Sequence, residues 1–144
     1  MDSLDLYALA EKENIEVIPF PMGNNGSMSY MTDSGGCYIG IDATIQADAV
    51  QERTHLSHEL GHCITGSFYN KYAAVDCRQR HENRADKWAI RKLITVDELD
   101  DALAAGCTQI WELAEHFGVT EQFMQKAVCY YTNGNLATEL YYFV

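Results

Sequence analysis

The sequence predicts an α+β fold: a small, mostly antiparallel three-stranded sheet packed on a pair of helices, followed by a helical C-terminal part. Three observations lead to this prediction. Short extended segments with glycine-rich turns fall within residues 15–42, helical periodicity dominates from residue 48 onwards, and neither a fixed repeat nor a long linker divides the chain. We therefore expect a single domain over residues 1–144, with a core over residues 1–95 and a helical subregion over residues 96–144.

The first third of the chain is expected to alternate between short elements and turns. A helix is expected over residues 3–13, where apolar residues follow helical spacing up to Asn14. Three strands are expected over residues 15–20, 27–32 and 37–42, with turns over residues 23–26 and 33–36. In the third strand Cys37, Ile39 and Ile41 share one face, which indicates the side that is buried.

Helices are expected to follow the strands. The first covers residues 48–64, with Asp48 or Thr44 near its N-cap and Gly66 just beyond its end. A second helix, reached through a loop, ends near Leu93. The remaining helices are expected over residues 96–104, 110–117 and 120–131.

Residues 110–128 have the pattern of a helix-turn-helix, which reads DNA in some proteins. A recognition helix needs cations or amides that face bases and phosphates, but the second helix offers only Lys126 as a cation, against Glu121. The first helix carries Glu112 and Glu115. We therefore interpret the segment as an αα unit that completes the core. Aromatic residues near the C-terminus are expected to pack against the domain or a partner: Tyr130, Tyr131, Tyr141, Tyr142 and Phe143.

Residues 58–62 read His-Glu-Leu-Gly-His, the most informative pattern in the chain. Residues four apart lie on one face of a helix, so the imidazoles of His58 and His62 can bind one Zn²⁺. Glu59 then lies beside the metal, where its carboxylate can activate a metal-bound water. The alternative is a helix with two scattered surface histidines.

A catalytic zinc site usually has three protein ligands and one open position. A third histidine ligand shortly after these two would require Gly at position 65 and His at position 68, whereas the chain has Thr65 and Phe68. Glu82 on the next expected helix is therefore the candidate third ligand. Asp86, one turn further on, is the candidate carboxylate that accepts a hydrogen bond from the other nitrogen of a ligating histidine. The alternative for both carboxylates is a solvated helix face.

This constellation resembles the ImmA/IrrE family of metallopeptidases. The resemblance extends more weakly from about residue 15 to about residue 130. It implies a zincin-like, gluzincin-type endopeptidase in which a sheet edge lies beside the metal helix and pairs with extended substrate. It also implies a narrow substrate, typically a helix-turn-helix repressor of a phage or mobile element. The matching residues are Thr54, His58-Glu59-Leu60-Gly61-His62, Glu82, Ala85, Asp86, Ala89 and the strand over residues 37–42.

The sequence therefore predicts a zinc-dependent endopeptidase. Glu59 is expected to take a proton from water and to deliver it to the leaving amine. The oxyanion needs a second stabiliser besides zinc. The candidates for this stabiliser are His55, Tyr30, His81 and Arg84, with an exposed or structural role as the alternative for the histidines. The alternative function is a regulatory module that holds a partner protein through the same groove with little or no proteolysis.

Composition indicates the setting in which the protein acts. A net charge of −11 argues against binding bare nucleic acid. Residues 71–92 carry a local balance of +4, for which a solvated helix face is the favoured interpretation. The chain has no apolar run long enough for a membrane span and no N-terminal signal pattern. Five cysteines without a C-x-x-C pair predict a reduced, cytoplasmic protein.

Overall fold

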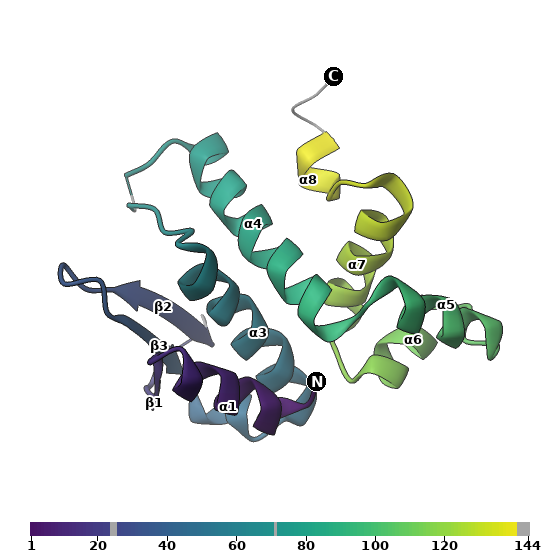
Figure 1. Cartoon of the computed structure of the whole chain (residues 1–144), viewed down its shortest axis with the longest axis horizontal. Coiled ribbons are helices and arrows are strands. Elements are labelled where there is room, and N and C mark those ends of the chain that lie inside the picture. Colours follow the sequence, from purple (N-terminus) through teal and green to yellow (C-terminus); the bar gives the residue numbers. More distant parts are fainter. Residues whose placement is uncertain (24–25, 71, 141–144) are drawn as a thin grey trace.

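The computed structural model describes residues 1–23, 26–70 and 72–140 and confirms the α+β fold (Figure 1). Its strands are β1 (Glu16–Pro19), β2 (Ser27–Met31) and β3 (Cys37–Ile41). Its helices are α1 (Ser3–Lys12), α2 (Ala43–Gln46), α3 (Ala49–Thr65), α4 (Val75–Leu93), α5 (Val96–Ala104), α6 (Ile110–Phe117), α7 (Glu121–Asn133) and α8 (Ala137–Leu140). Part of the expected 23–26 turn, one residue of the basic segment and three of the C-terminal aromatic residues lie outside the described residues: Asn24, Asn25, Lys71, Tyr141, Tyr142 and Phe143. Tyr130 and Tyr131 are described and pack against the buried core, as expected.

The three strands form a mixed sheet in the order β1-β3-β2. β2 pairs with β3 in antiparallel fashion, as expected for a hairpin, and the Thr32 amide donates to the Gly36 carbonyl across the turn (2.8 Å). β1 pairs with β3 in parallel, so the sheet is less antiparallel than the sequence predicted. The reason is that the chain reverses once between β1 and β2 and again in the hairpin between β2 and β3, so β3 runs in the same direction as β1.

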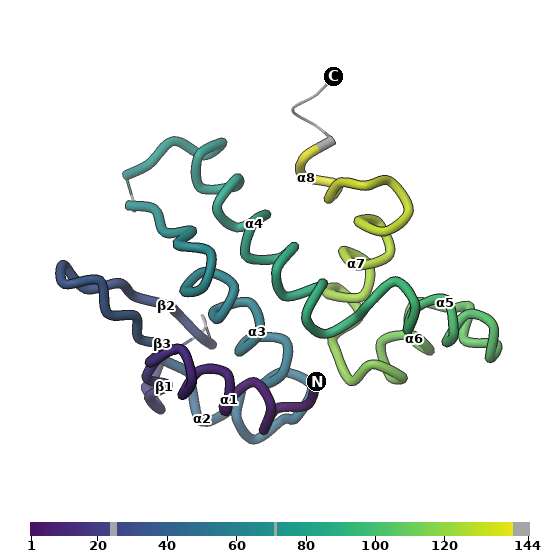
Figure 2. The backbone as a smooth tube through the Cα atoms, in the orientation of Figure 1, coloured from purple at the N-terminus to yellow at the C-terminus, as the bar shows by residue number. Residues whose placement is uncertain are grey.

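Helix α3 separates the sheet from α4 (Figures 1 and 2). Asp48 caps its N-terminus by accepting hydrogen bonds from two backbone amides, and Gly66 ends it in the left-handed conformation (φ 68°). Gly66 was expected at this place, and Asp48 was one of two expected caps, with Thr44 as the other. α3 and α4 approach closely at Gly61, where an added Cβ would lie 2.5 Å from the Ala85 carbonyl oxygen. A glycine is therefore required at this crossing.

The buried residues form a cluster that connects the sheet with the C-terminal helices. Ile39 of β3, Leu56 of α3 and Ile90 of α4 are all fully buried within it. Phe117 of α6 and Phe123 of α7 belong to the same cluster, so the segment with the helix-turn-helix pattern packs as the predicted αα unit. In the described part of the chain, no helix combines the length and the apolar character that crossing a bilayer requires.

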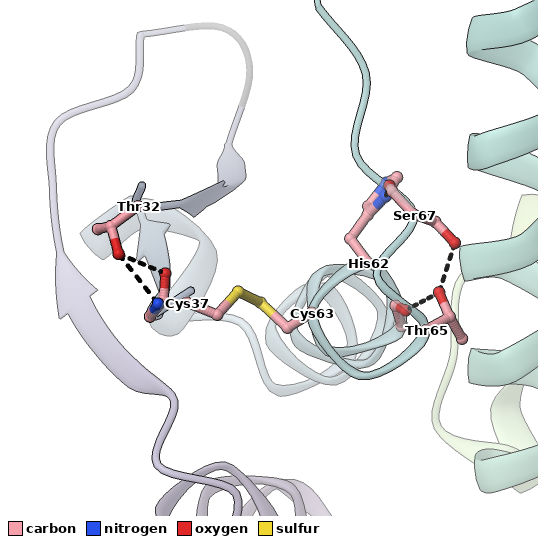
Figure 3. Close-up of a disulfide and its surroundings, with 8 residues drawn as sticks. Thr32, Cys37, His62, Cys63, Thr65 and Ser67 are labelled. Carbon is pink, nitrogen blue, oxygen red and sulfur yellow. Dashed lines mark hydrogen bonds between the residues drawn. A yellow bond between two sulfur atoms is a disulfide. The ribbon is translucent and has the colours of Figure 1, made fainter. Parts of the chain in front are cut away.

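The prediction of a fully reduced chain is wrong for one pair of cysteines. Cys37 of β3 and Cys63 of α3 form a disulfide (Figure 3). Their Cα atoms lie 6.0 Å apart because the buried face of β3 packs against the last turns of α3. Cysteine spacing along the chain does not reveal this pairing, since 26 residues separate the partners. The remaining cysteines, Cys77, Cys107 and Cys129, are free.

Candidate metal centre

Two histidines of α3 and one glutamate of α4 converge on a single point. The Nε2 atom of His58 lies 3.2 Å from Nε2 of His62 and 2.8 Å from a carboxylate oxygen of Glu82. The second histidine, His62, lies 3.3 Å from the same carboxylate. A tetrahedral zinc site with ligands at about 2.0–2.1 Å separates its ligand atoms by about 3.3 Å. The three side chains therefore have the spacing that a metal ion requires, and together they form a group that could hold one.

The other nitrogen of each histidine ring is engaged, which fixes how the ring is turned. Nδ1 of His62 donates to the Ser67 carbonyl oxygen, which can only accept. Nδ1 of His58 lies 2.8 Å from Asp86 Oδ1, the carboxylate expected in this place. When neutral, as metal binding requires, each ring therefore directs a lone pair from Nε2 towards Glu82. Three acceptor atoms that face one point require a positive charge between them, either a proton or a metal ion.

The electrostatics of the three side chains agree with this requirement. Burial lowers the pKa of His58, but hydrogen bonds to Asp86 and Glu82 outweigh burial and raise it to about 10. Burial raises the pKa of Glu82, but hydrogen bonds from His58 and His62 outweigh it and hold that pKa well below its ordinary range. Glu82 is therefore an anion at neutral pH.

Glu59 lies beside the converging atoms without joining them. Its side chain is 6% exposed, and its Oε2 atom accepts a hydrogen bond from the Ser27 hydroxyl of β2 (2.8 Å). It lines a cleft of about 560 Å³ together with His58, His62 and Glu82. The cleft places a buried carboxylate next to the candidate metal ligands, which is the arrangement that water activation needs.

The four candidates for oxyanion stabilisation lie in different surroundings. His55 is half-buried, lines the cleft and contacts the Ser27 hydroxyl through Nδ1 (2.8 Å). Tyr30 is 60% exposed on β2, and Arg84 is exposed on α4. His81 packs against Tyr69, with ring centroids 6.1 Å apart. Of the four, the structure places only His55 along the cleft that contains Glu59.

Sequence reasoning missed several residues that contact the centre. The Tyr69 hydroxyl, from the loop after α3, donates to Glu82 Oε1 (2.7 Å). Burial and this hydrogen bond raise the pKa of Tyr69 to about 12, so the phenol keeps its proton at neutral pH. Lys126 of α7 contacts Asp86 Oδ2 (3.0 Å). No spacing rule could have indicated these residues, because tertiary packing alone brings them to the centre.

A helix-borne H-E-x-x-H pair with a carboxylate from a second helix is the ligand arrangement of zincin-like metallopeptidases. Residues 10–128 match the Peptidase_M78 family, described as the IrrE N-terminal-like domain. The chain belongs to this family, and the resemblance seen in the sequence is thereby confirmed. Comparison with curated proteins gives no match, and comparison with solved structures gives none either.

Proposed function

We propose that the protein is a zinc-dependent endopeptidase that cleaves a cognate helix-turn-helix repressor of a phage or mobile element in the cytoplasm. The observation that carries the peptidase assignment is the convergence of His58, His62 and Glu82 beside the buried Glu59. Membership of the Peptidase_M78 family supports a protein substrate. The repressor rests on the resemblance to ImmA/IrrE proteins, and the cytoplasmic setting rests on the composition of the chain.

The three converging side chains would hold the metal, which when bound supplies a Lewis acid and lowers the pKa of water. The chain's own residues then manage the protons. Glu59 accepts the proton of the attacking water and passes it to the leaving amine. Asp86 keeps Nδ1 of His58 engaged, so that the ring presents Nε2 to the centre. Tyr69 lies along the cleft and keeps its phenolic proton, so it can donate to the peptide oxygen.

The cleft is suited to an extended peptide. Ser27 and Met28 of β2 line one side of it, and Phe68 and Tyr69 line another. β2 is an edge strand that pairs only with β3 among the described strands, so its outer edge offers unpaired backbone groups. We therefore infer that substrate adds to this edge as a strand and runs past Glu59.

The experiment is to incubate the zinc-loaded protein with helix-turn-helix repressors and to compare it with Glu59→Gln. We expect the variant to keep the metal and to lose cleavage by a factor of at least about 10³, because an amide cannot accept the proton. His58→Ala serves as the second control and should lose the metal as well. A Glu59→Gln variant that cuts at the wild-type rate contradicts the role of Glu59. A repressor that binds stably and stays intact with zinc present favours the regulatory binding module.

A further inference from the structure

A chain of hydrogen bonds connects β2 to the carboxylate of Glu59. The Ser27 hydroxyl lies 2.8 Å from Glu59 Oε2 and 2.8 Å from Nδ1 of His55. The histidine lies one helical turn before Glu59 on α3, so both side chains reach the same side of the helix. The serine is the only one of the three that comes from the sheet.

The direction of these hydrogen bonds follows from the chemistry of the groups. An ionised carboxylate only accepts, so the hydroxyl hydrogen of Ser27 must point to Glu59. The serine oxygen can then only accept from His55, which must carry its proton on Nδ1. Burial lowers the pKa of His55, so the ring is neutral at pH 7 and Nδ1 holds its single proton. The carboxylate thus sets the tautomer of a histidine that it does not touch.

The neighbouring backbone fixes the position of both donors. Ser27 pairs with Ile41 in the sheet register, which places its side chain over α3. Gly26, the residue before it, packs so closely that an added Cβ would lie 3.0 Å from Cε1 of His55. The imidazole is therefore held between the start of β2 and its own helix.

We propose that Ser27, oriented by His55, is a positioning residue that holds one carboxylate oxygen of Glu59 and leaves the other oxygen to exchange protons with water. This inference rests on the proposed peptidase function. In this proposal His55 orients the Ser27 hydroxyl, and Ser27 in turn holds Glu59, the general base. A carboxylate fixed on one oxygen has one orientation towards the reacting water, which is the condition for efficient proton transfer.

Loss of the serine hydroxyl should affect turnover more than binding. Ser27→Ala should lower kcat by about 10–100-fold with KM within about twofold, as for other residues that orient a catalytic group. Ser27→Thr keeps the hydroxyl and should recover most of the rate. His55→Asn keeps an N–H near the place of Nδ1 and should lose less activity than His55→Ala.

A spectroscopic measurement tests the hydrogen bonds without any substrate. Long-range ¹H–¹⁵N spectra of the full-length, zinc-loaded protein labelled on histidine report which ring nitrogen carries the proton. We expect Nδ1–H for His55 in the wild type and loss of that preference in both Ser27→Ala and Glu59→Ala. Ser29→Ala, on the same strand without a bond to Glu59, should leave the tautomer unchanged.

The two kinds of failure are distinguishable. An Nε2–H tautomer of His55 in the wild type, or a tautomer indifferent to Glu59→Ala, overturns the positioning role even if the protein is an active peptidase. Wild-type turnover by Ser27→Ala overturns it as well. If the wild type cleaves neither repressors nor labelled casein, the proposed function fails, and the tautomer spectra alone decide whether Ser27 holds Glu59.

Discussion

Asp86 is held at both of its oxygens by side chains from two different helices. Oδ1 lies 2.8 Å from Nδ1 of His58 on α3, and Oδ2 lies 3.0 Å from Nζ of Lys126 on α7. Burial raises the pKa of Asp86, but its contacts with His58 and Lys126 outweigh burial and lower it. The carboxylate therefore stays ionised and keeps the histidine ring turned towards the candidate metal centre.

Removing the cation of Lys126 should weaken metal binding. Lys126→Met leaves a buried carboxylate with one partner, so we expect the zinc affinity to fall by about tenfold, and by about 10–100-fold for Asp86→Asn. Competition with a chromogenic chelator measures this affinity. Lys87→Met is the matched control, because Lys87 pairs with Glu139 and not with Asp86. Equal affinities of Lys126→Met and the wild type would contradict a role for α7 in the site.

Zinc affinity should rise with pH in the neutral range. The pKa of His58 is raised to about 10 in the metal-free protein, so this ring is protonated at pH 7 and zinc must displace the proton. One displaced proton makes the apparent affinity rise about tenfold per pH unit, and the rise ends near the pKa of His58. Chelator competition between pH 6 and pH 9 measures the slope. A flat profile would show that no proton leaves the ligands when zinc binds.

Helical geometry explains which site residues could be predicted. A spacing of four residues within one helix places His58 with His62, and the same spacing on the next helix places Glu82 with Asp86. The structure brings these four side chains together. Ser27, Tyr69 and Lys126 lie far from the motif in sequence and reach it only through the packing of a strand, a loop and a distant helix. No local pattern could have indicated them.

At the level of the elements, the close crossing of α3 and α4 brings the glutamate of one helix to the histidines of the other. Gly61 lies between the two histidines, and a Cβ there would lie 2.5 Å from the Ala85 carbonyl oxygen. The contact is with backbone, so no side chain can turn away to relieve it. The distance between α3 and α4 therefore depends on this glycine. A larger distance would move the Glu82 carboxylate away from His58 and His62.

Gly61→Ala should therefore destabilise both the fold and the metal centre. Alanine in a helix interior favours folding by about 1 kcal/mol, but forced separation of packed helices costs about 1–3 kcal/mol or more. We expect the clash to prevail, with a lower free energy of unfolding in urea and weaker zinc binding. Gly40→Ala is the control, since its Cβ would meet ordinary contacts at 3.5 Å and beyond. A Gly61→Ala protein as stable as the wild type would contradict the tight crossing.

The disulfide between Cys37 and Cys63 joins β3 to the residue after His62. Closing a loop between cysteines 26 residues apart restricts the unfolded chain, which corresponds to about 3–4 kcal/mol in the loop-entropy account. The bond ties the sheet to the helix that carries both histidines. The cysteine pattern predicted that all cysteines are reduced, and this disulfide contradicts that prediction.

Most elements were predictable, whereas strand order was not. Glycines, caps and apolar spacing mark both ends of α3 and the start of α7 in the sequence, since these signals are local. The parallel pairing of β1 with β3 depends on where the hairpin folds back, which no local signal records. The short helices α2 and α8 were missed because four residues are too few to show a helical period.

Across the fold, the candidate metal centre connects segments that are distant in the chain. α3 and α4 supply the ligands, β2 supplies Ser27 beside the base, and α7 supplies Lys126 behind Asp86. Metal binding and the packing of these segments should therefore support each other, because a ligand that binds only the folded chain stabilises it. Zinc binding at this centre requires the three proposed ligands to act together.

The most direct measurement is the metal content of the purified protein by mass spectrometry, without chelator and after addition of zinc. We expect about one zinc per wild-type chain, retained in Glu59→Gln and in the control Glu115→Ala at an exposed residue, and lost in Glu82→Ala. A wild-type protein that takes up no metal, or a Glu82→Ala protein that retains its zinc fully, would contradict the three-ligand centre.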